Sequence, residues 1–410
     1  MYSTIQSAYR QYHSCETALV KVANDILLNL DKGEEALLLL LDYKAAFDTI
    51  IHEKFLSRLQ ERYGIRGVAF DLIKSYFQNR MHKVVIGGSM SDAKSSSHGV
   101  PQGSVFGPVA FSLYVAPLYD IICKHNLKGM MYADDTQVYV LVKKGHQGEA
   151  ILQIQACMTD IKNWSVKNGL KLNEEKTEVI HFRSKFRQSE SIDTISFGNT
   201  VINTVDSARN LGVRLDEHLA LSGHVKHICK AASFALHKIG TIRPFLSKKS
   251  TERLVHAHVI SRLDFCNGIL YGLPENEIQK LQRIQNSAAR LVTCTRLRDH
   301  ITPILEKLHW LPIRQRIEFK ILTLVFLCLH ELGPDYLQEL ITKYCPTRNL
   351  RSQSKSQLVS RTVSTVSYGA RSFQQAASEL WNKLPMNLRQ TDTLDNFKSL
   401  LKTHLFYSLK

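Results

Sequence analysis

The chain has 410 residues, of which 44% are hydrophobic and 22% are charged, so it is not intrinsically disordered and can bury the cores of two or three domains. Its eight cysteines include no C-x-x-C pair and show no regular spacing, which argues against a disulfide framework and against a zinc module. The net charge is +16, and residues 221–410, with 28 Lys and Arg against 13 Asp and Glu, contribute +15 of it. This asymmetry favours a basic surface for a polyanionic partner in the second part of the chain.

The longest mainly apolar run, residues 321–329, is about half as long as a membrane-spanning helix requires. Residues 2–16 are polar, so no secretory signal opens the sequence. We therefore expect no membrane association, and an intracellular location in the nucleus or the cytoplasm.

The first 220 residues mix short apolar runs with helical patterns. Residues 36–41 (ALLLLL) predict a buried strand that ends at Asp42 and leads through a turn into a helix over 43–59. Further along we expect, in chain order, a strand over 82–86 with a turn at Gly87-Gly88, a helix over 105–122 interrupted near Pro108, a hairpin over 130–142 with its turn at Asp134-Asp135, a helix over 151–168 and a strand over 171–182.

After about residue 220 the pattern becomes almost wholly helical, with helices predicted over 224–242, 276–292 and 313–332. Residues 343–372 are rich in Ser, Thr and Arg and predict a linker or extended arm. A last helix is expected over 394–409, and no internal repeat is evident.

Three aspartates carry the strongest chemical signal. Asp134 and Asp135 are adjacent between two apolar segments, and on their own they could form a solvated turn. Asp42, at the end of another predicted strand, could add a third carboxylate. Two carboxylates about 4 Å apart repel by roughly 4 kcal/mol at an effective dielectric constant near 20, so such a cluster needs cations. Hard oxygen ligands select Mg²⁺ or Mn²⁺.

These residues lie in stretches that resemble reverse transcriptases. YADD at 132–135 resembles motif C of that family, LLLDYKAAFDTI at 39–50 resembles motif A, and HGVPQGSVFGP at 98–108 resembles motif B. Further stretches match as well: GLKLNEEKTEVIHF at 169–182 resembles motif D, and RNLGVRLD at 209–216 resembles the primer-grip motif E. QSAYRQYHSCETAL at 6–19 resembles the stretch before motif A in non-LTR (LINE-type) retrotransposon enzymes, and the tail at 381–406 resembles the C-terminus of Jockey and chicken-repeat type elements.

The resemblance implies an α+β right-hand polymerase whose palm contains an antiparallel sheet. Its regions would be partial fingers at 1–35, the palm at 36–220, a helical thumb at 221–300, a C-terminal helical region at 301–342, a linker or extended arm at 343–372 and a helical tail at 373–410. The implied activity is that of an RNA-directed DNA polymerase, which uses an RNA template, a DNA primer, deoxynucleoside triphosphates and two Mg²⁺ or Mn²⁺ ions.

The resemblance also implies catalytic roles for four side chains. Asp42 and Asp134 would bind metal, Asp135 would be a weaker or supporting ligand, and the backbone carbonyl of Tyr43 would complete a metal shell. Lys176 would protonate the departing pyrophosphate. Alternatively, it could simply be a surface partner of Asn173 or Glu174.

Phe47, Gln102 and Gly103 match nucleotide-binding positions of the family. Phe47 would stack under the incoming sugar and exclude a 2′-hydroxyl, which needs a close apolar wall; alternatively it is a core aromatic residue. Gln102 and Gly103 would contact nucleotide and template, although Pro101-Gln102-Gly103 could be an ordinary turn.

Seven residues are candidates for contact with the nucleic acid. Leu211 and Gly212 lie in the motif that resembles the primer grip. Basic side chains of the expected thumb helices could bind the phosphates of a primer–template duplex, or could simply form solvated faces: Lys226, Lys230, Lys238, Arg283 and Arg290.

In the family a further fingers segment precedes the QSAYR stretch, so we expect an N-terminally truncated enzyme without its endonuclease or ribonuclease H domain. The rival hypothesis is a non-catalytic nucleic-acid-binding remnant. His13, His52, His98 and Arg10 are interpreted as solvated surface groups.

Overall fold

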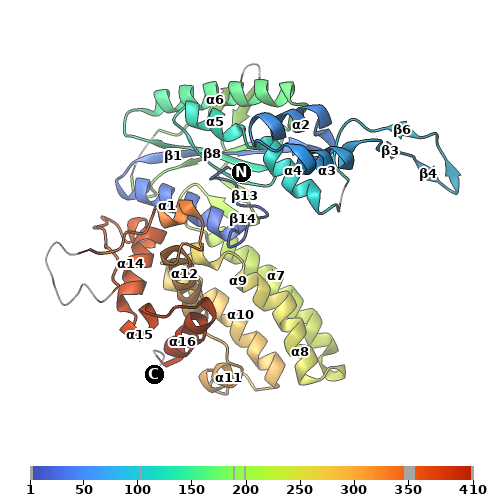
Figure 1. Ribbon diagram of the computed structural model, residues 1–410. Coiled ribbons are helices and arrows are strands. Elements are labelled where there is room, and N and C mark those ends of the chain that lie inside the picture. The colour runs from blue at the N-terminus through green and yellow to red at the C-terminus, as the bar shows by residue number, and fades with distance from the viewer. Residues whose placement is uncertain (1–2, 102, 188–189, 198–199, 346–355, 408–410) are drawn as a thin grey trace.

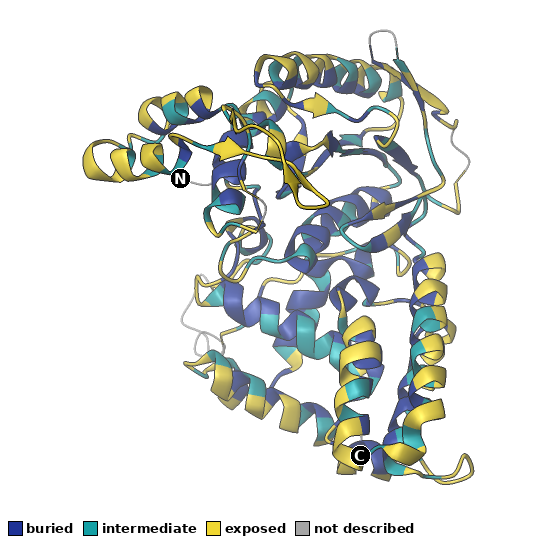
Figure 2. Ribbon diagram, turned by 90° about the vertical axis from the view of Figure 1, so that its right-hand side faces the viewer, coloured by how far each residue is buried: buried dark blue, intermediate teal, exposed yellow. Residues whose placement is uncertain are grey.

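The computed structural model of the protein describes residues 3–101, 103–187, 190–197, 200–345 and 356–407. Its upper part in Figure 1 is built around a β-sheet, and its lower part consists of helices that extend away from the sheet. Buried residues gather in the middle of the molecule, where these two parts meet, and exposed residues line the outer faces of the helices (Figure 2). The mixture of sheet and helices agrees with the expected α+β class.

The central sheet has four antiparallel strands in the order β10–β1–β8–β7. They are β1 (Glu35–Leu41), β7 (Lys128–Tyr132), β8 (Asp135–Val142) and β10 (Glu178–Phe182). The leucine-rich run predicted as a buried strand forms β1, which lies in the middle with β8 on one side and β10 on the other. A continuous apolar run suits this position because both faces of the strand are covered.

The sheet separates two hydrophobic cores. Ala36 and Leu38 contribute to one core, whereas Leu37 and Leu39 contribute to the other, since successive side chains of a strand point to opposite faces. The first core contains α1 (Cys15–Asp31) and the helices of the lower part. The second core is covered by four helices: α2 (His52–Glu61), α4 (Phe106–Val115), α5 (Leu118–Lys124) and α6 (Gln147–Lys167).

The sequence prediction for residues 105–122 was wrong about the position of the interruption. Pro108 lies in the first turn of α4, where a missing N–H breaks no helical hydrogen bond, and the break falls at Ala116-Pro117 between α4 and α5. Among the described residues, one helical stretch, residues 106–124, is long and apolar enough to cross a membrane. More than half of it is buried inside the protein, and a buried core helix meets the same criteria, so it is weak evidence for a membrane span.

A narrow hairpin arm projects to the right in Figure 1. It follows α3 (Gly67–Phe77) and consists of four short strands: β3 (Met81–His82), β4 (Val85–Ile86), β5 (Ser89–Met90) and β6 (Lys94–Ser95). β3 pairs with β6, and β4 pairs with β5. The sequence predicts one strand and a turn here, and the structure adds the returning strands.

Three more strand pairs flank the sheet: β2 (Tyr43–Lys44) with β9 (Lys171–Leu172), β11 (Thr194–Phe197) with β12 (Thr200–Asn203), and β13 (Ser207–Asn210) with β14 (Val213–Asp216). The single strand predicted over 171–182 is therefore divided into β9 and β10, with a turn over 173–177 between them.

The lower part contains ten α-helices within the described ranges: α7 (Ser222–Ile242), α8 (Lys248–Val255), α9 (Ser261–Asp264), α10 (Glu275–Thr293), α11 (Thr302–Lys307), α12 (Ile313–Leu329), α13 (Asp335–Gln338), α14 (Phe373–Lys383), α15 (Met386–Arg389) and α16 (Leu394–Tyr407). α12 packs against α10, α14 and α16, and Phe326 stacks on Phe397 with ring centroids 4.5 Å apart. The expected thumb, C-terminal region and tail therefore share one core.

A linker or extended arm is predicted over 343–372, of which residues 346–355 lie outside the described residues. Residues 356–372 differ from that prediction. Asp31, at the end of α1, accepts hydrogen bonds from the backbone N and the Oγ1 of Thr365, at 2.6 and 2.8 Å. The Tyr368 hydroxyl accepts one from the Lys185 backbone N at 2.9 Å. The polar groups of this segment bind the folded protein in place of water, which fixes the segment against α1 and the sheet.

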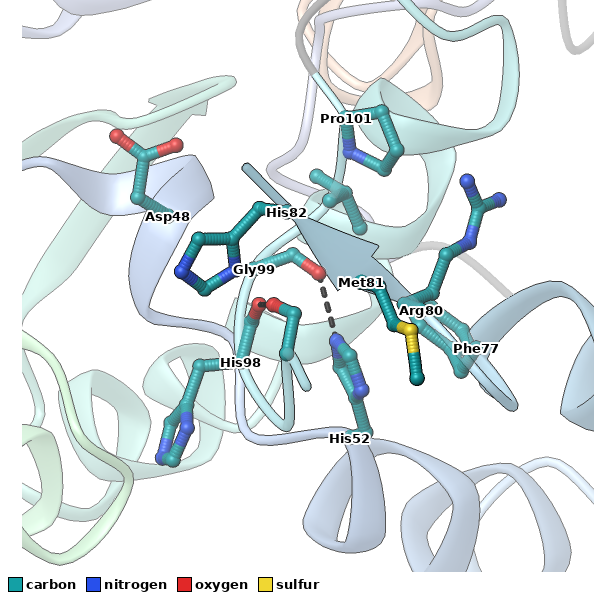
Figure 3. Close-up of a pocket in the computed structure, with 11 residues that line it drawn as sticks. Asp48, His52, Phe77, Arg80, Met81, His82, His98, Gly99 and Pro101 are labelled. Carbon is teal, nitrogen blue, oxygen red and sulfur yellow. Dashed lines mark hydrogen bonds between the residues drawn. The ribbon is translucent and has the colours of Figure 1, made fainter. Parts of the chain in front are cut away.

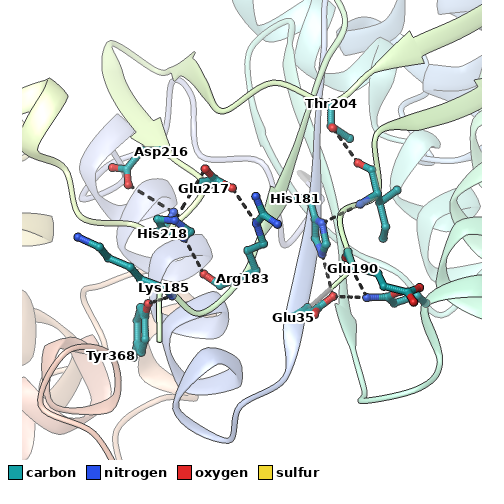
Figure 4. A network of polar contacts seen from close by, with 12 residues as sticks. Glu35, His181, Arg183, Lys185, Glu190, Thr204, Asp216, Glu217, His218 and Tyr368 are labelled. Carbon is teal, nitrogen blue, oxygen red and sulfur yellow. Dashed lines mark hydrogen bonds and ion pairs between the residues drawn. The ribbon is translucent and has the colours of Figure 1, made fainter. Parts of the chain in front are cut away.

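A polar network ties the edge of the sheet to the β13–β14 hairpin (Figure 4). Arg183, which follows β10, donates from Nε to Glu217 Oε2 at 2.8 Å, and its carbonyl accepts from His218 Nδ1 at 3.0 Å. Nearby, His181 Nε2 donates to Glu35 Oε2 at 2.8 Å. These contacts fix the hairpin, and with it the start of α7, relative to β1.

Candidate active site

The sheet brings the three predicted carboxylates to one end. Leu41 pairs with Thr136 in the antiparallel register of β1 and β8, so the next residues, Asp42 and Asp135, lie opposite each other where the strands end. Asp134 precedes Asp135 in the turn that joins β7 to β8. The prediction that a second strand places Asp42 beside the aspartate pair is confirmed.

Burial and the repulsion between carboxylates both act on this end of the sheet. Burial raises the pKa of Asp135 to about 6, with further contributions from the charges of Asp134 and Asp42. Burial and the charge of Asp134 also raise the pKa of the Tyr9 hydroxyl. The site therefore holds more negative charge than its surroundings balance.

The donor chemistry suits a hard divalent cation, because three carboxylates lie at one end of the sheet and none of them has an ion pair among the residues that the structure describes. The carboxylate of Asp42 is held by a hydrogen bond, which its Oδ2 accepts from Asn173 Nδ2 at 2.8 Å. Within the described ranges, no three His, Cys, Asp or Glu side chains are close enough to form a finished metal centre. The residues therefore fit a metal ion by charge and by ligand type.

We expect Asp135→Asn to stabilise the metal-free protein above pH 6. Because the pKa of Asp135 is raised in the folded state, from 3.8 to about 6, the folded protein binds this proton more tightly than the unfolded chain does. Its stability therefore falls as the pH rises from about 4 to about 6 and then stays lowered. The carboxyl of Asp135 is only partly buried and the residue also reaches solvent, so screening leaves a difference of about 1 kcal/mol.

Urea unfolding at several pH values measures this effect, with Asp71→Asn, at an exposed position of α3, as the control. The Asp135→Asn protein should lose the decline between about pH 4 and pH 6 that the unsubstituted protein and the control show. Identical pH profiles for all three proteins would contradict the electrostatic account.

Tyr43 begins β2, and its side chain points into the core. The ring is 5% exposed, its hydroxyl lies 3.4 Å from Ser165 Oγ, and burial raises its pKa to about 12. The side chain is therefore structural. Only its backbone carbonyl, which follows Asp42 directly, remains available for the role that the resemblance implies.

Phe47 lies in the 3₁₀ turn η1 (Ala46–Thr49) and is half-buried. Its ring stacks on Phe111 of α4, with centroids 4.8 Å apart, and its carbonyl accepts a hydrogen bond from Val100 N at 3.0 Å. One face of the ring thus belongs to the core, and the rest reaches the surface. This placement is compatible with both hypotheses for Phe47, a core aromatic residue and an apolar wall against the sugar, because such a wall must be packed against the core on its other side.

Motifs A and B are joined by contacts that the sequence does not reveal. Gly99 N donates to the Ile50 carbonyl at 2.8 Å, and the Gly99 carbonyl accepts from His52 Nε2 at 2.7 Å (Figure 3). A Cβ on Gly99 would lie 2.9 Å from the Asp48 carbonyl oxygen, and the φ of Gly99 is +79°. Glycine is required there for both reasons.

Beside this junction lies an open pocket of about 530 Å³ between motif A, motif B and the base of the arm (Figure 3). Its polar side chains include Asp48, His52, Arg80, His82 and His98. The sequence gives no sign of it, because its walls come from three separate stretches of the chain.

The interpretation of His52 as a solvated surface group was wrong. The residue is 8% exposed, and burial lowers the pKa of its ring. His13 and Arg10 are half-buried, and Arg10 Nη1 donates to the Gln6 carbonyl at 3.0 Å, whereas His98 is exposed as expected. The side chains of His52 and Arg10 are hydrogen-bonded to backbone carbonyls, and local sequence does not predict such partners.

Gly103 has a φ of +79° and is exposed, with open space where a Cβ would lie. Its backbone conformation favours glycine, and no protein atom crowds it. Gln102, predicted to contact nucleotide and template, lies outside the described residues.

Lys176 is exposed in the turn between β9 and β10 that begins at Asn173. Glu174, which the sequence offered as its surface partner, pairs instead with Lys162 at 2.6 Å and accepts from Thr200 Oγ1 at 2.6 Å. In the described part of the chain Lys176 has no ion pair. Its chain position places it near Asp42, because Asn173 N donates to the Asp42 carbonyl at 2.8 Å.

Leu211 and Gly212 form the turn of the β13–β14 hairpin, with φ values of +44° and +85°. The hairpin is fixed to the sheet because Asn210 Nδ2 donates to Gln137 Oε1 on β8 at 2.8 Å. A Cβ on Gly212 would lie 2.9 Å from the Phe265 ring, so the turn packs against the helical part.

Four of the five predicted basic residues are exposed: Lys226, Lys230 and Lys238 on α7, and Arg283 on α10. The three lysines recur at spacings of four and eight residues, which places them on one face of α7. Arg290 is different, because it is half-buried and donates to the carbonyls of Arg296 and Asp299 at 3.4 and 3.2 Å. It stabilises the loop after α10.

The family described as reverse transcriptase (RNA-dependent DNA polymerase) matches residues 1–215 of the chain, which is more than half of it. The chain is 26% identical over 299 residues to a probable RNA-directed DNA polymerase from transposon BS of Drosophila melanogaster, covering 70% of the chain and 32% of that protein. It is 27% identical over 258 residues to the RNA-directed DNA polymerase from the mobile element jockey of Drosophila funebris, covering 61% and 27%. The chain thus spans about a third of the length of these relatives.

Among solved structures, telomerase from Candida albicans in complex with a fragment of telomeric RNA matches with a TM-score of 0.36 and 12% identity, over 72% of this chain and 51% of that one. Apo telomerase from Candida tropicalis matches with a TM-score of 0.35 and 13% identity, over 76% and 51%. Both scores are low, so the sequence match alone decides the family.

Proposed function

Because the chain belongs to the reverse transcriptase (RNA-dependent DNA polymerase) family, we propose that it adds deoxynucleotides to the 3′-hydroxyl of a DNA primer paired with an RNA template. The observation that carries the proposal is the convergence of Asp42, Asp134 and Asp135 at one end of the central sheet. The relatives named above are RNA-directed DNA polymerases of mobile elements, which supports the same chemistry.

In this proposal Asp42 and Asp134 would hold two Mg²⁺ or Mn²⁺ ions, Asp135 would support them, and the Tyr43 carbonyl would be a further ligand. The ions would lower the pKa of the primer hydroxyl and would neutralise negative charge on the pyrophosphate. Lys176, exposed in the turn next to Asp42, would donate the proton that the departing pyrophosphate takes up.

The incoming nucleotide would lie between Phe47 and the motif B turn. The Phe47 ring, supported from behind by Phe111, would form the apolar wall below the sugar. The exposed backbone at Gly103, with no protein atom where a Cβ would lie, leaves room for close approach of a ligand to the main chain. Gln102 keeps its proposed role as the neighbouring contact.

The primer–template duplex would be held by the β13–β14 turn at Leu211 and Gly212 and by the exposed basic side chains of the lower helices. Lys226, Lys230 and Lys238 form a row along α7, and Arg283 lies on the adjacent α10. Such a row binds phosphates without reading the base sequence.

Replacing these lysines should lower the affinity for a nucleic-acid duplex and should also make that affinity less sensitive to salt. We expect Lys226→Gln and Lys230→Gln each to reduce the slope of log affinity against log salt by about 0.9 on B-form DNA, with little sequence preference. Fluorescence anisotropy with a labelled duplex measures this slope. Lys167→Gln on α6, at the opposite end of the molecule (Figure 1), is the matched control, and slopes equal to the control would show that the row is a solvated face.

Primer extension tests the function directly. The 410-residue chain is incubated with an RNA template, a labelled DNA primer, deoxynucleoside triphosphates and Mg²⁺ or Mn²⁺. Extension that a chelator abolishes supports the proposal. Duplex binding without extension, under all of these conditions, would support the rival function of a nucleic-acid-binding protein that uses the sheet only as a scaffold.

A further inference from the structure

Gln6 lies in an N-terminal segment that runs along the outer edge of the central sheet. Its main chain is fixed there because Met131 N of β7 donates to the Ile5 carbonyl at 2.9 Å and Ser7 N donates to the Met131 carbonyl at 2.8 Å. The Gln6 side chain is 1% exposed. Both its backbone and its carboxamide are therefore held in place beside the turn that carries the aspartate pair.

The carboxamide of Gln6 binds that turn from outside the hairpin. Its Oε1 accepts hydrogen bonds from Ala133 N at 3.1 Å and from Ala8 N at 3.0 Å. Ala133 directly precedes Asp134 and has a φ of +56°, a left-handed conformation that alanine rarely adopts. The bond from Gln6 thus stabilises an unfavourable backbone conformation at the residue before a catalytic carboxylate.

Asn173 binds the other catalytic segment in a similar way. It is 5% exposed, its Nδ2 donates to Asp42 Oδ2, and its backbone N donates to the Asp42 carbonyl, both at 2.8 Å. The Asn173 carbonyl in turn accepts from Thr177 N and Thr177 Oγ1, each at 3.0 Å. Both the side chain and the main chain of Asp42 are therefore fixed by one residue 131 positions later.

Packing alone does not explain these two amides. Gln6 Nε2 and Asn173 Oδ1 are buried and have no hydrogen-bond partner among the residues that the structure describes. A buried unpaired polar atom lowers stability, and an apolar side chain of similar size would avoid that loss. What the amides provide is their bonds to Ala133 and Asp42.

We propose that Gln6 and Asn173 are positioning residues that hold the Asp134 turn and the Asp42 carboxylate in register for metal binding. The catalytic consequence rests on the proposed function, whereas the structural consequence does not. Both side chains are buried, so each would act through the carboxylate segment that it binds.

Apolar replacements of similar size test the proposal. Gln6→Met and Asn173→Leu should each lower kcat by about 10- to 100-fold, because misplacement by about 1 Å can cost on the order of 100-fold in rate. The nucleotide KM and the duplex affinity should change by less than about threefold. The control is Gln285→Met: Gln285 is fully buried in α10, and its Nε2 donates to the Leu311 carbonyl at 2.8 Å. It should lose stability and keep its kcat.

Two readouts do not depend on catalysis. Hydrogen exchange at the Ala133 amide should accelerate by about tenfold or more in Gln6→Met and should stay slow in Asn173→Leu and Gln285→Met. Gln6→Glu retains an oxygen acceptor at the same reach and should restore slow exchange. Binding of Mn²⁺ alone, followed by electron spin resonance, should weaken by about tenfold in Gln6→Met and Asn173→Leu only, because a ligand set held less well binds its ion less tightly.

Failure of the proposed function and failure of this inference are distinguishable. If the unsubstituted chain extends no primer, the exchange and Mn²⁺ measurements still decide the positioning roles. Unchanged exchange at Ala133 in Gln6→Met would overturn the role of Gln6. Mn²⁺ affinity in Asn173→Leu equal to that in Gln285→Met would overturn the role of Asn173, and kcat losses that merely follow stability in all three variants would overturn both.

Discussion

Replacing Asp134 with asparagine should reduce nucleotide addition by about 1000-fold or more, which corresponds to about 4 kcal/mol of transition-state stabilisation. The substitution removes the proposed charged oxygen ligand at the turn between β7 and β8 and changes no residue of the basic row on α7. Duplex affinity measured in a chelator should therefore stay within about twofold. Single-turnover primer extension with saturating substrates measures the loss.

The fold of the Asp134→Asn variant should be at least as stable as that of the unsubstituted protein. The charge of Asp134 raises the pKa of Asp135, so its removal relieves repulsion at the end of the sheet. Asp71→Asn on exposed α3 is the control and should extend primers normally. Extension by Asp134→Asn at the rate of this control would exclude Asp134 as a metal ligand.

Replacing Phe47 with valine should raise the use of ribonucleotides relative to deoxyribonucleotides by up to about 100-fold, because an apolar wall rejects an added hydroxyl by about that factor. The shorter side chain opens space beside the sugar, while Phe111 still closes the core behind it. The ratio of kcat/KM for the two kinds of nucleotide measures the effect.

Phe106→Val is the matched control for Phe47→Val. Phe106 is also half-buried and packs against the same core, with its ring near Phe55, Tyr76 and Phe77. Both variants should lose stability, by about 1–3 kcal/mol. Only Phe47→Val should change the choice of sugar; an unchanged choice in both would leave Phe47 as a core aromatic residue.

Local patterns in the sequence determined much of the candidate site. The run ALLLLL predicts β1, because a strand buried on both faces needs a continuous apolar run, and the apolar segments around Asp134 and Asp135 predict the β7–β8 hairpin. The spacing of Lys226, Lys230 and Lys238 predicts one exposed face of a helix. Each of these features depends on residues only a few positions apart, so its periodic pattern can be recognised in the sequence itself.

Contacts between distant parts of the chain decided the rest. Residues 356–372 have the composition of a linker, yet Thr365 binds Asp31, more than 300 positions earlier. Arg290 has the pattern of a phosphate contact, yet loop carbonyls occupy its guanidinium. A polar side chain binds whichever partner the fold brings within hydrogen-bonding distance, and composition does not specify that partner.

The sequence by itself determined which residues are candidates for the chemistry: Asp42, Asp134 and Asp135 lie beside apolar segments and in stretches that resemble two motifs of the family. Only the tertiary structure decided how they are held. β1 lies between β8 and β10, which places Asp42 opposite Asp135, and the buried amides of Gln6 and Asn173 bind the two carboxylate segments. The physical reason is that a carboxylate can be identified from local sequence, whereas its orientation depends on pairings across about a hundred residues, which the antiparallel register establishes only when the sheet forms.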